Sequence, residues 1–217
     1  MLAGRFDREG VSIPRSTQTS WLLQCYEAIK PLGEVLKEVV LDSGYLFTDD
    51  TPIPLQVKGH GRVKKGRLWV YVRGGPGPPL AVYDFSPDRS KRRPLDFLDG
   101  YRGYVHADAY SGYDELFERD GVIEVGCWVH ARRKFDEAVS SRPRESTEIM
   151  GRIAQLYKVE SGCKDMGPQQ PCAYRNTHAR PIINRLFTRL EELVPETTPS
   201  EPLRKAINPA RWQAGMH

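Results

Sequence analysis

The sequence has few cysteines and no long apolar segment, and each absence excludes a class of protein. Only 4 of its 217 residues are cysteine, and no two of them form a Cys-x-x-Cys pair, so we expect reduced thiols rather than a disulfide scaffold. No apolar run approaches the roughly 20 residues that a membrane-spanning helix needs. Residues 1–10 lack the apolar segment of a signal peptide. We therefore expect a cytoplasmic protein with no membrane partner.

The charge of the chain is mildly basic, and its distribution is more informative than its total. The formal net charge is +4, which permits a nucleic-acid partner without requiring one. Basic residues gather in three runs, at 62–67, 89–93 and 132–134. Such runs are usually solvated surfaces, and contact with phosphate is the alternative where a run lies beside candidate active-site residues.

The first half of the chain reads as one helical segment followed by three strands. Apolar residues recur at helical spacing over 10–41, with Pro31 marking a kink or a break between two helices. Aromatic and β-branched residues then predict strands at 45–48, 67–73 and 80–85. The Gly- and Pro-rich segment 74–79 reads as a hairpin loop. Three strands without an intervening helix predict an antiparallel meander.

The second half alternates helices with strands and then becomes helical. We expect strands at 103–107 and 122–127, and helices at 94–101, 113–119, 130–139, 148–159 and 179–194, with a break around 162–171. By fold-level analogy, this order is that of a ribonuclease H-like core, so the expected fold class is α/β, a mixed sheet with flanking helices. The expected domains are a helical connecting segment (1–43), an incomplete core (44–140) and a C-terminal helical insertion (141–217).

Two aspartates follow apolar, strand-like runs and are the candidate catalytic residues. Asp49 stands where we expect the first strand to end, and Asp108 directly follows the fourth. Hydrolysis or transfer of a phosphodiester needs carboxylates that hold Mg²⁺ at the mouth of a cleft. A central sheet could bring these two acids side by side. Strands also often end in Asp because Asp favours turns, so position alone leaves both interpretations open.

Five segments of the chain resemble motifs of one family, the insertion-sequence sixty-six transposases. In chain order they are DDTP (49–52), GRLWVYVR (66–73), FSPDR (85–89), HADAYSGY (106–113) and CWVHARRKF (127–135). They resemble the family's DETP, GRLWVYVRD, YSPDR, QADAYAGY and CWAHARRKF. Their number and order identify the chain as similar to the central catalytic domain of these DDE-type transposases.

The resemblance implies a function, a metal and partners. It implies that Asp49 and Asp108 are the first two catalytic, metal-binding acids, with two Mg²⁺ (or Mn²⁺) ions in the complete enzyme. Asp50 stands where the family has Glu and keeps its charge. The implied activity is DNA cleavage and strand transfer in transposition. The implied partners are transposon-end DNA, target DNA and further copies of the protein in a transposition complex.

The same resemblance predicts that the chain is incomplete and inactive by itself. The family's third acid lies in a later NNxxERxxR motif, which this sequence lacks, and we expect the likeness to fade after Ile207, with an unrelated tail from about residue 208. Glu160 is expected to be a structural residue rather than a substitute for that acid. The alternative function is therefore a non-catalytic remnant that binds DNA or interacts with other subunits.

The segment after the second acid offers further candidates. Cys127 and His130 could supply half of a zinc site, but no second close pair completes it. For His130 we rank local packing first, contact with phosphate or DNA second and metal ligation third. Arg132, Arg133 and Lys134 could contact a DNA backbone, and a solvated helix surface is an equally good interpretation for each.

Overall fold

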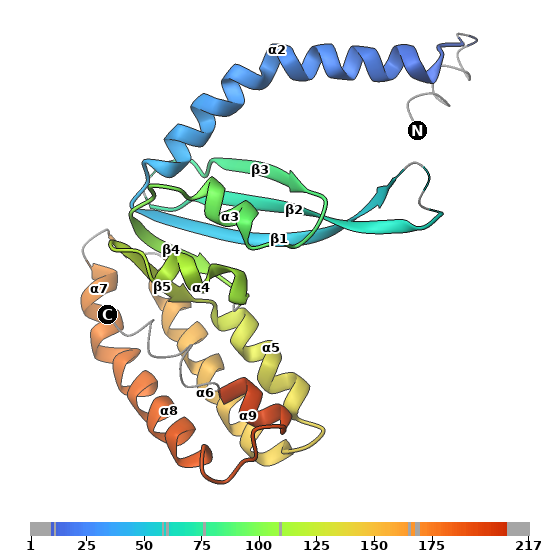
Figure 1. The fold of residues 1–217 in the computed structure, drawn as a ribbon. Coiled ribbons are helices and arrows are strands. Elements are labelled where there is room, and N and C mark those ends of the chain that lie inside the picture. The colour runs from blue at the N-terminus through green and yellow to red at the C-terminus, as the bar shows by residue number, and fades with distance from the viewer. Residues whose placement is uncertain are drawn as a thin grey trace. The chain divides into compact units, whose positions relative to one another are not determined.

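The computed structural model describes residues 10, 12–57, 59, 61–75, 77–108, 110–164, 166–167 and 170–207. The tail expected from about residue 208 therefore lies outside the described residues. Hydrogen-bonded neighbours give one five-stranded sheet in the order β3-β2-β1-β4-β5, with helices before and after it in the chain (Figure 1). The strands are β1 (Tyr45–Gln56), β2 (Val63–Arg73), β3 (Ala81–Ser86), β4 (Gly103–Ala107) and β5 (Val122–Gly126).

The chain divides into two compact units, and the boundary crosses β4 and β5. Unit 1 contains the residues up to Val105 together with Glu118–Val122, and unit 2 contains His106–Phe117 and the residues from Ile123 onward. The helices of unit 1 are α2 (Arg15–Leu41) and α3 (Arg92–Phe97). Those of unit 2 are the short turns η1 (Ser111–Tyr113) and α4 (Asp114–Phe117), followed by α5 (Trp128–Ala138), α6 (Pro143–Gly162), α7 (Gln170–His178), α8 (Arg180–Leu193) and α9 (Pro202–Ile207).

The helix α2 runs through Pro31 without interruption, so of the two predicted alternatives at this residue the break is excluded and the kink is the one observed (Figure 1). Proline has no backbone N–H to donate, and its ring crowds the carbonyl of the preceding turn, which bends a helix without necessarily ending it. Figure 1 shows α2 bending part-way along its length. The helix ends at Leu41 near the start of β1, and Val40 is its one fully buried residue.

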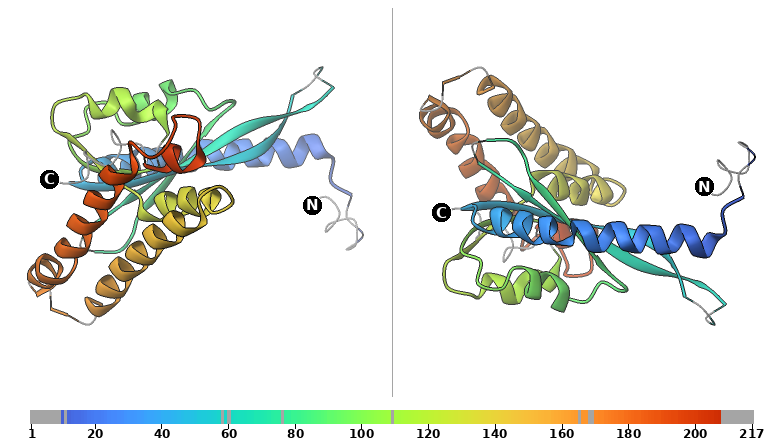
Figure 2. Two further views of the ribbon diagram at one scale, coloured as in Figure 1. Left: turned by 90° about the horizontal axis from the view of Figure 1, so that it is seen from below. Right: turned by 90° about the horizontal axis from the view of Figure 1, so that it is seen from above.

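The strands β1, β2 and β3 form the antiparallel meander that the sequence predicts. Figure 2 shows β1 and β2 as a long twisted ribbon. The predicted end of β1 before Asp49 and Asp50 is wrong, because the strand continues to Gln56 and pairs with β2 along its whole length. Side chains alternate across it: Leu46 and Thr48 are buried, whereas Phe47 and Asp49 are exposed. The two acids therefore point to opposite faces of β1.

The core of unit 1 lies between the sheet and α3. Trp69 and Tyr71 on β2 are fully buried. The ring of Tyr71 stacks on that of Phe97 from α3, with centroids 3.6 Å apart and planes 4° apart. The Nζ atom of Lys37 from α2 lies 4.7 Å from the centroid of Phe97, within the range of a cation–π interaction. These aromatic contacts join α2, β2 and α3.

The core of unit 2 is built by four helices. Apolar residues at helical spacing on α5, α6, α8 and α9 pack together. They are Phe135, Ala138, Ile149, Ile153, Leu156, Leu186, Leu190, Leu193, Leu203, Ala206 and Ile207. Trp128 is partly buried against them. Sequence periodicity predicted α5, α6 and α8 but missed α7 and α9. None of the described helices is long and apolar enough to cross a membrane.

Candidate active site

Asp108 follows directly on β4, as its sequence position predicts. The strand ends at Ala107, which is buried, and Asp108 is half-buried. Its Oδ1 atom accepts a hydrogen bond from the backbone N–H of Tyr110 at 3.2 Å. This bond to the following turn fixes the carboxylate close to the end of the strand, where a rigid backbone positions it.

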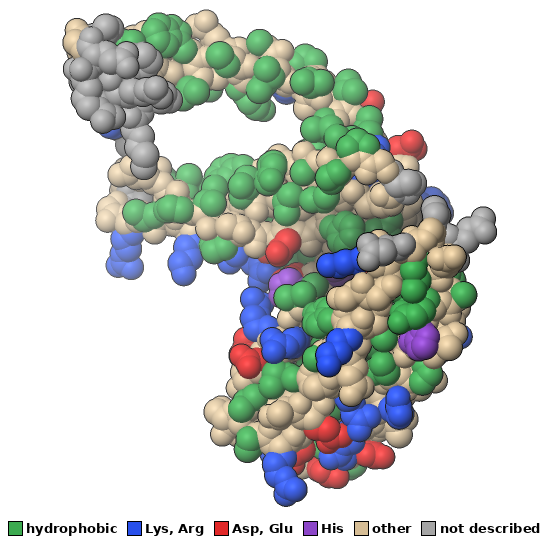
Figure 3. Space-filling model, turned by 180° about the vertical axis from the view of Figure 1, so that it is seen from behind, with side chains coloured by type: hydrophobic (Ala, Val, Ile, Leu, Met, Phe, Trp, Pro, Cys, Tyr) green, Lys and Arg blue, Asp and Glu red, His purple; other side chains and the backbone are tan. Residues whose placement is uncertain are grey.

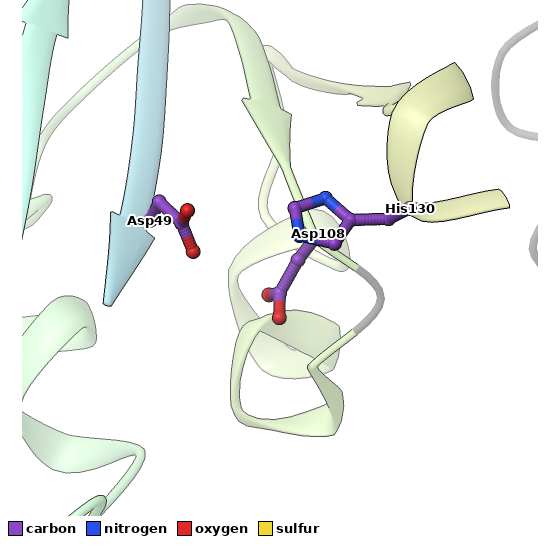
Figure 4. A group of neighbouring side chains, drawn as sticks. All are labelled: Asp49, Asp108 and His130. Carbon is purple, nitrogen blue, oxygen red and sulfur yellow. The ribbon is translucent and has the colours of Figure 1, made fainter. Parts of the chain in front are cut away.

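His130 lies on the first turn of α5 in the same unit and approaches Asp108. A ring nitrogen of His130 and a carboxylate oxygen of Asp108 lie within 4.8 Å of each other. Figure 4 shows His130 extending from α5 and Asp108 from the segment after β4. Two atoms bound to one cation at about 2.0–2.2 Å are themselves separated by about 3–4 Å. Small side-chain movements would therefore allow both residues to bind one ion.

Cys127 precedes α5 and has an unusually acidic thiol. Burial raises its pKa, but this effect is outweighed by hydrogen bonds from the side chain of His106 and the backbone N–H of His130, which bring the pKa to about 6. The thiol is therefore largely ionised at neutral pH. The sequence offered Cys127 as half of a metal pair, with His106 as a further candidate only if the fold gathered it. The pairing of β4 with β5 brings His106 close to Cys127.

Asp49 belongs to unit 1, where it occupies the exposed face of β1 opposite Val70 in the strand register. Its Oδ1 atom accepts a hydrogen bond from the backbone N–H of Asp50 at 2.8 Å. Figure 4 shows its carboxylate extending from β1.

Asp50 has a different role, because two arginines of unit 1 bind its carboxylate. Arg67 from β2 donates to Oδ2 at 2.8 Å, and Arg89 donates to Oδ1 through Nη2 at 2.6 Å. The Asp50 side chain is 1% exposed. Two of the three basic runs therefore each contribute one arginine to an internal ion pair, which the sequence analysis did not foresee.

The remaining basic and acidic candidates are distributed over unit 2. Arg132, Arg133 and Lys134 are exposed on α5, and Lys134 pairs with Glu137 at 2.8 Å. Glu160 is bound by Arg175 of α7, whose Nε lies 2.9 Å from its Oε2. This pair attaches α7 to α6 and supports the interpretation of Glu160 as a structural residue.

In an α/β protein, a carboxylate at a strand end beside an imidazole is an arrangement compatible with binding a divalent cation. A family model described as "Transposase IS66 family" matches residues 2–215. The chain belongs to this family. The match continues past Ile207, where we expected the likeness to end.

Two curated relatives come from Sinorhizobium fredii. "Uncharacterized protein y4qI" is 26% identical over 213 residues, which cover 92% of this chain and 40% of the relative. "Uncharacterized protein y4jD" is 28% identical over 210 residues, which cover 91% of this chain and 41% of the relative. The chain thus spans about two-fifths of the length of the curated relatives that it matches.

Proposed function

We propose that the chain is a catalytic-core segment of a DDE-type transposase with a ribonuclease H-like sheet, acting in metal-dependent DNA cleavage and strand transfer. The observation that carries the proposal is the approach of His130 to Asp108 at the end of β4. Membership of the IS66 family supports the assignment to transposition. Asp49, an exposed residue of β1, is proposed as the first catalytic acid, with Asp108 as the second.

The donor set fits a divalent cation. Asp108 and His130 would hold the ion, with Asp49 as a further carboxylate ligand, and two such ions stabilise the attacking and leaving oxygens of a phosphodiester. Mg²⁺ prefers oxygen ligands, whereas imidazole suits transition ions. The participation of His130 therefore favours Mn²⁺ over Mg²⁺ for the ion that this pair holds. We therefore propose metal ligation as the main role of His130, although the sequence alone ranked it third.

DNA is the proposed partner, and exposed arginines next to the site would contact it. Arg132 and Arg133 stand on the turn of α5 that follows His130, so their guanidinium groups can neutralise backbone phosphates close to the reacting one. Arg62, Lys64 and Lys65 are exposed on the β1–β2 ribbon. Figure 3 shows Lys and Arg side chains projecting from this ribbon. We propose transposon-end and target DNA as the ligands of the longer protein.

A second candidate is a segment that binds DNA without cleaving it. The exposed basic residues of the β1–β2 ribbon favour it, because phosphate contact requires no metal. Because this chain is expected to be inactive by itself, Mn²⁺ binding and DNA binding together separate the two functions. The proposed function predicts Mn²⁺ binding that Asp108→Ala and Asp49→Ala both weaken and that Asp96→Asn, at an exposed ion pair, retains. DNA binding without Mn²⁺ binding in the unaltered chain would favour the second candidate.

A further inference from the structure

The helix α2 exposes an apolar face that no described residue of the chain covers. In the part of α2 that precedes its buried C-terminal end, the largest apolar side chains are about half or more exposed. They include Leu22 at 61%, Ile29 at 63% and Leu32 at 70%. Figure 3 shows apolar side chains along α2 and an opening between the middle of this helix and the strands of the same unit. Contiguous apolar surface of this extent marks an interaction site rather than ordinary exposure of single residues.

The spacing of these residues is that of a coiled-coil seam. Leu22, Cys25, Ile29 and Leu32 follow one another at intervals of three and four residues, and the pattern continues through Leu36 and Val39. Heptad spacing of this kind presents a narrow row of side chains to a second helix. Pro31 lies outside the row, so its ring does not interrupt the seam before the bend.

The charges on α2 are arranged so that two copies can meet along this seam. Between Trp21 and Val40 no charged residue occupies the seam or a position that flanks it. The charged residues of this stretch are Glu27, Lys30, Glu34, Lys37 and Glu38. The flanking positions hold only Trp21, Tyr26, Ala28, Gly33, Val35 and Val40. Facing α2 helices would therefore bury apolar surface without burying a charge.

We propose that the occupant of this face is the α2 helix of a second copy of the chain. A two-fold pairing places the same surface on both copies, which suits a self-complementary apolar seam. A lipid surface is disfavoured, because interfacial helices are rich in Lys and Arg on the polar face, whereas the part of α2 between Trp21 and Val40 carries three acidic and two basic residues there. The inference stands independently of the proposed catalytic function.

Sedimentation velocity over a concentration series tests the pairing. The unaltered chain is expected to form a dimer, and a chain with Leu22→Glu and Ile29→Glu is expected to dissociate at least ~100-fold more readily, since each buried aliphatic side chain is worth about tenfold in affinity. The matched control is Glu27→Lys on the charged face, which should leave the dimer unchanged. Far-UV circular dichroism and the thermal transition verify that the variants remain folded.

Oxidative cross-linking provides an independent readout, because Cys25 occupies a seam position and is exposed. Mild oxidation is expected to yield a covalent dimer that Cys25→Ser removes and Cys172→Ser, at an exposed cysteine of unit 2, retains. Three results would overturn the proposal: a monomer throughout the concentration series, a dimer that the seam substitutions leave intact, or cross-linking through Cys172 alone. Binding of α2 to neutral phospholipid vesicles by a monomeric chain would also overturn it, in favour of a lipid partner.

Discussion

Arg89 binds both carboxylate oxygens of Asp50 across 39 positions of sequence. Its Nη2 and Nε atoms lie 2.6 Å and 2.9 Å from Oδ1, and Nε lies 3.2 Å from Oδ2. Arg67 completes the arrangement from β2. The carboxylate thereby connects β1 to β2 and to the segment after β3, and it fixes the strand that carries the neighbouring Asp49.

Replacing Asp50 with Asn should destabilise the chain strongly. The substitution removes the negative charge that compensates two arginines, and breaking an ion pair at a buried side chain costs about 3–5 kcal/mol. Because Arg67 and Arg89 are partly exposed, we expect the lower end of this range. Urea denaturation measures the change in the free energy of unfolding.

The matched control for Asp50 is Asp96→Asn, which removes the partner of Arg92 at a pair whose side chains are 62% and 85% exposed. Exposed pairs contribute at most about 1 kcal/mol. Equal effects of the two substitutions would contradict the structural role of Asp50.

Replacing Ser86 with Ala should leave a buried donor unsatisfied. The indole N–H of Trp69 donates to Ser86 Oγ at 2.8 Å, and both residues are buried. An unsatisfied buried donor costs about 1–3 kcal/mol. Thermal unfolding should show the loss for Ser86→Ala and little change for Ser140→Ala, which alters an exposed residue. A stable Ser86→Ala chain would mean that water replaces the hydroxyl.

The reactivity of Cys127 should reflect its acidic thiol. In a chain whose other three cysteines are replaced by Ser, the rate of alkylation by iodoacetamide should rise with a midpoint near pH 6, because the thiolate is the reactive form. His106→Ala removes the largest favourable hydrogen bond and should move the midpoint to higher pH. A midpoint above pH 8 in the chain that retains His106 would contradict this environment.

The loss of folding stability at acidic pH should depend partly on Glu148, which joins α6 to α8. Burial raises its pKa, but hydrogen bonds from Arg152 at 2.8 Å and Arg189 at 3.1 Å outweigh this effect and lower the pKa. Its contribution is therefore present above the ordinary value of 4.5 and is lost as pH falls through the lowered value in the folded chain.

The test compares Glu148→Gln with the unaltered chain from neutral to acidic pH. The variant should be less stable at pH 7 by about 1 kcal/mol or less, as expected for partly exposed pairs, and the difference should vanish at low pH. Glu191→Gln, which alters an exposed residue of α8, should show the same dependence of the free energy of unfolding on pH as the unaltered chain. A difference that persists at pH 2 would indicate a cause other than ionisation.

The sequence predicted local structure where pattern and tertiary pairing agree. Gly103–Ala107 was predicted with its observed bounds, because its alternation is uninterrupted. The extension of β1 through Pro52 and Pro54 was missed, because these residues are poor strand formers and only their pairing with Arg67 and Lys65 of β2 keeps the strand extended. The polar helix α7, with no buried residue, gives no periodic signal.

In the candidate site, too, local features could be predicted from the sequence, whereas contacts between distant segments could not. The position of Asp108 at a strand end could be predicted, since it depends on a local apolar run. The approach of His130 could not be derived from pattern, because it depends on how α5 leaves β5. The two arginines that bind Asp50 lie 17 and 39 positions away in sequence, and no local signal connects them to it.

Mn²⁺ binding, measured by the loss of the electron paramagnetic resonance signal of the free ion, tests directly whether Asp108 and His130 form one metal site. We expect binding in the unaltered chain, its loss in Asp108→Ala and His130→Ala, weakening in Asp49→Ala and no change in Asp96→Asn. Binding that survives both Asp108→Ala and His130→Ala in folded chains would contradict the assignment of these residues to one metal site.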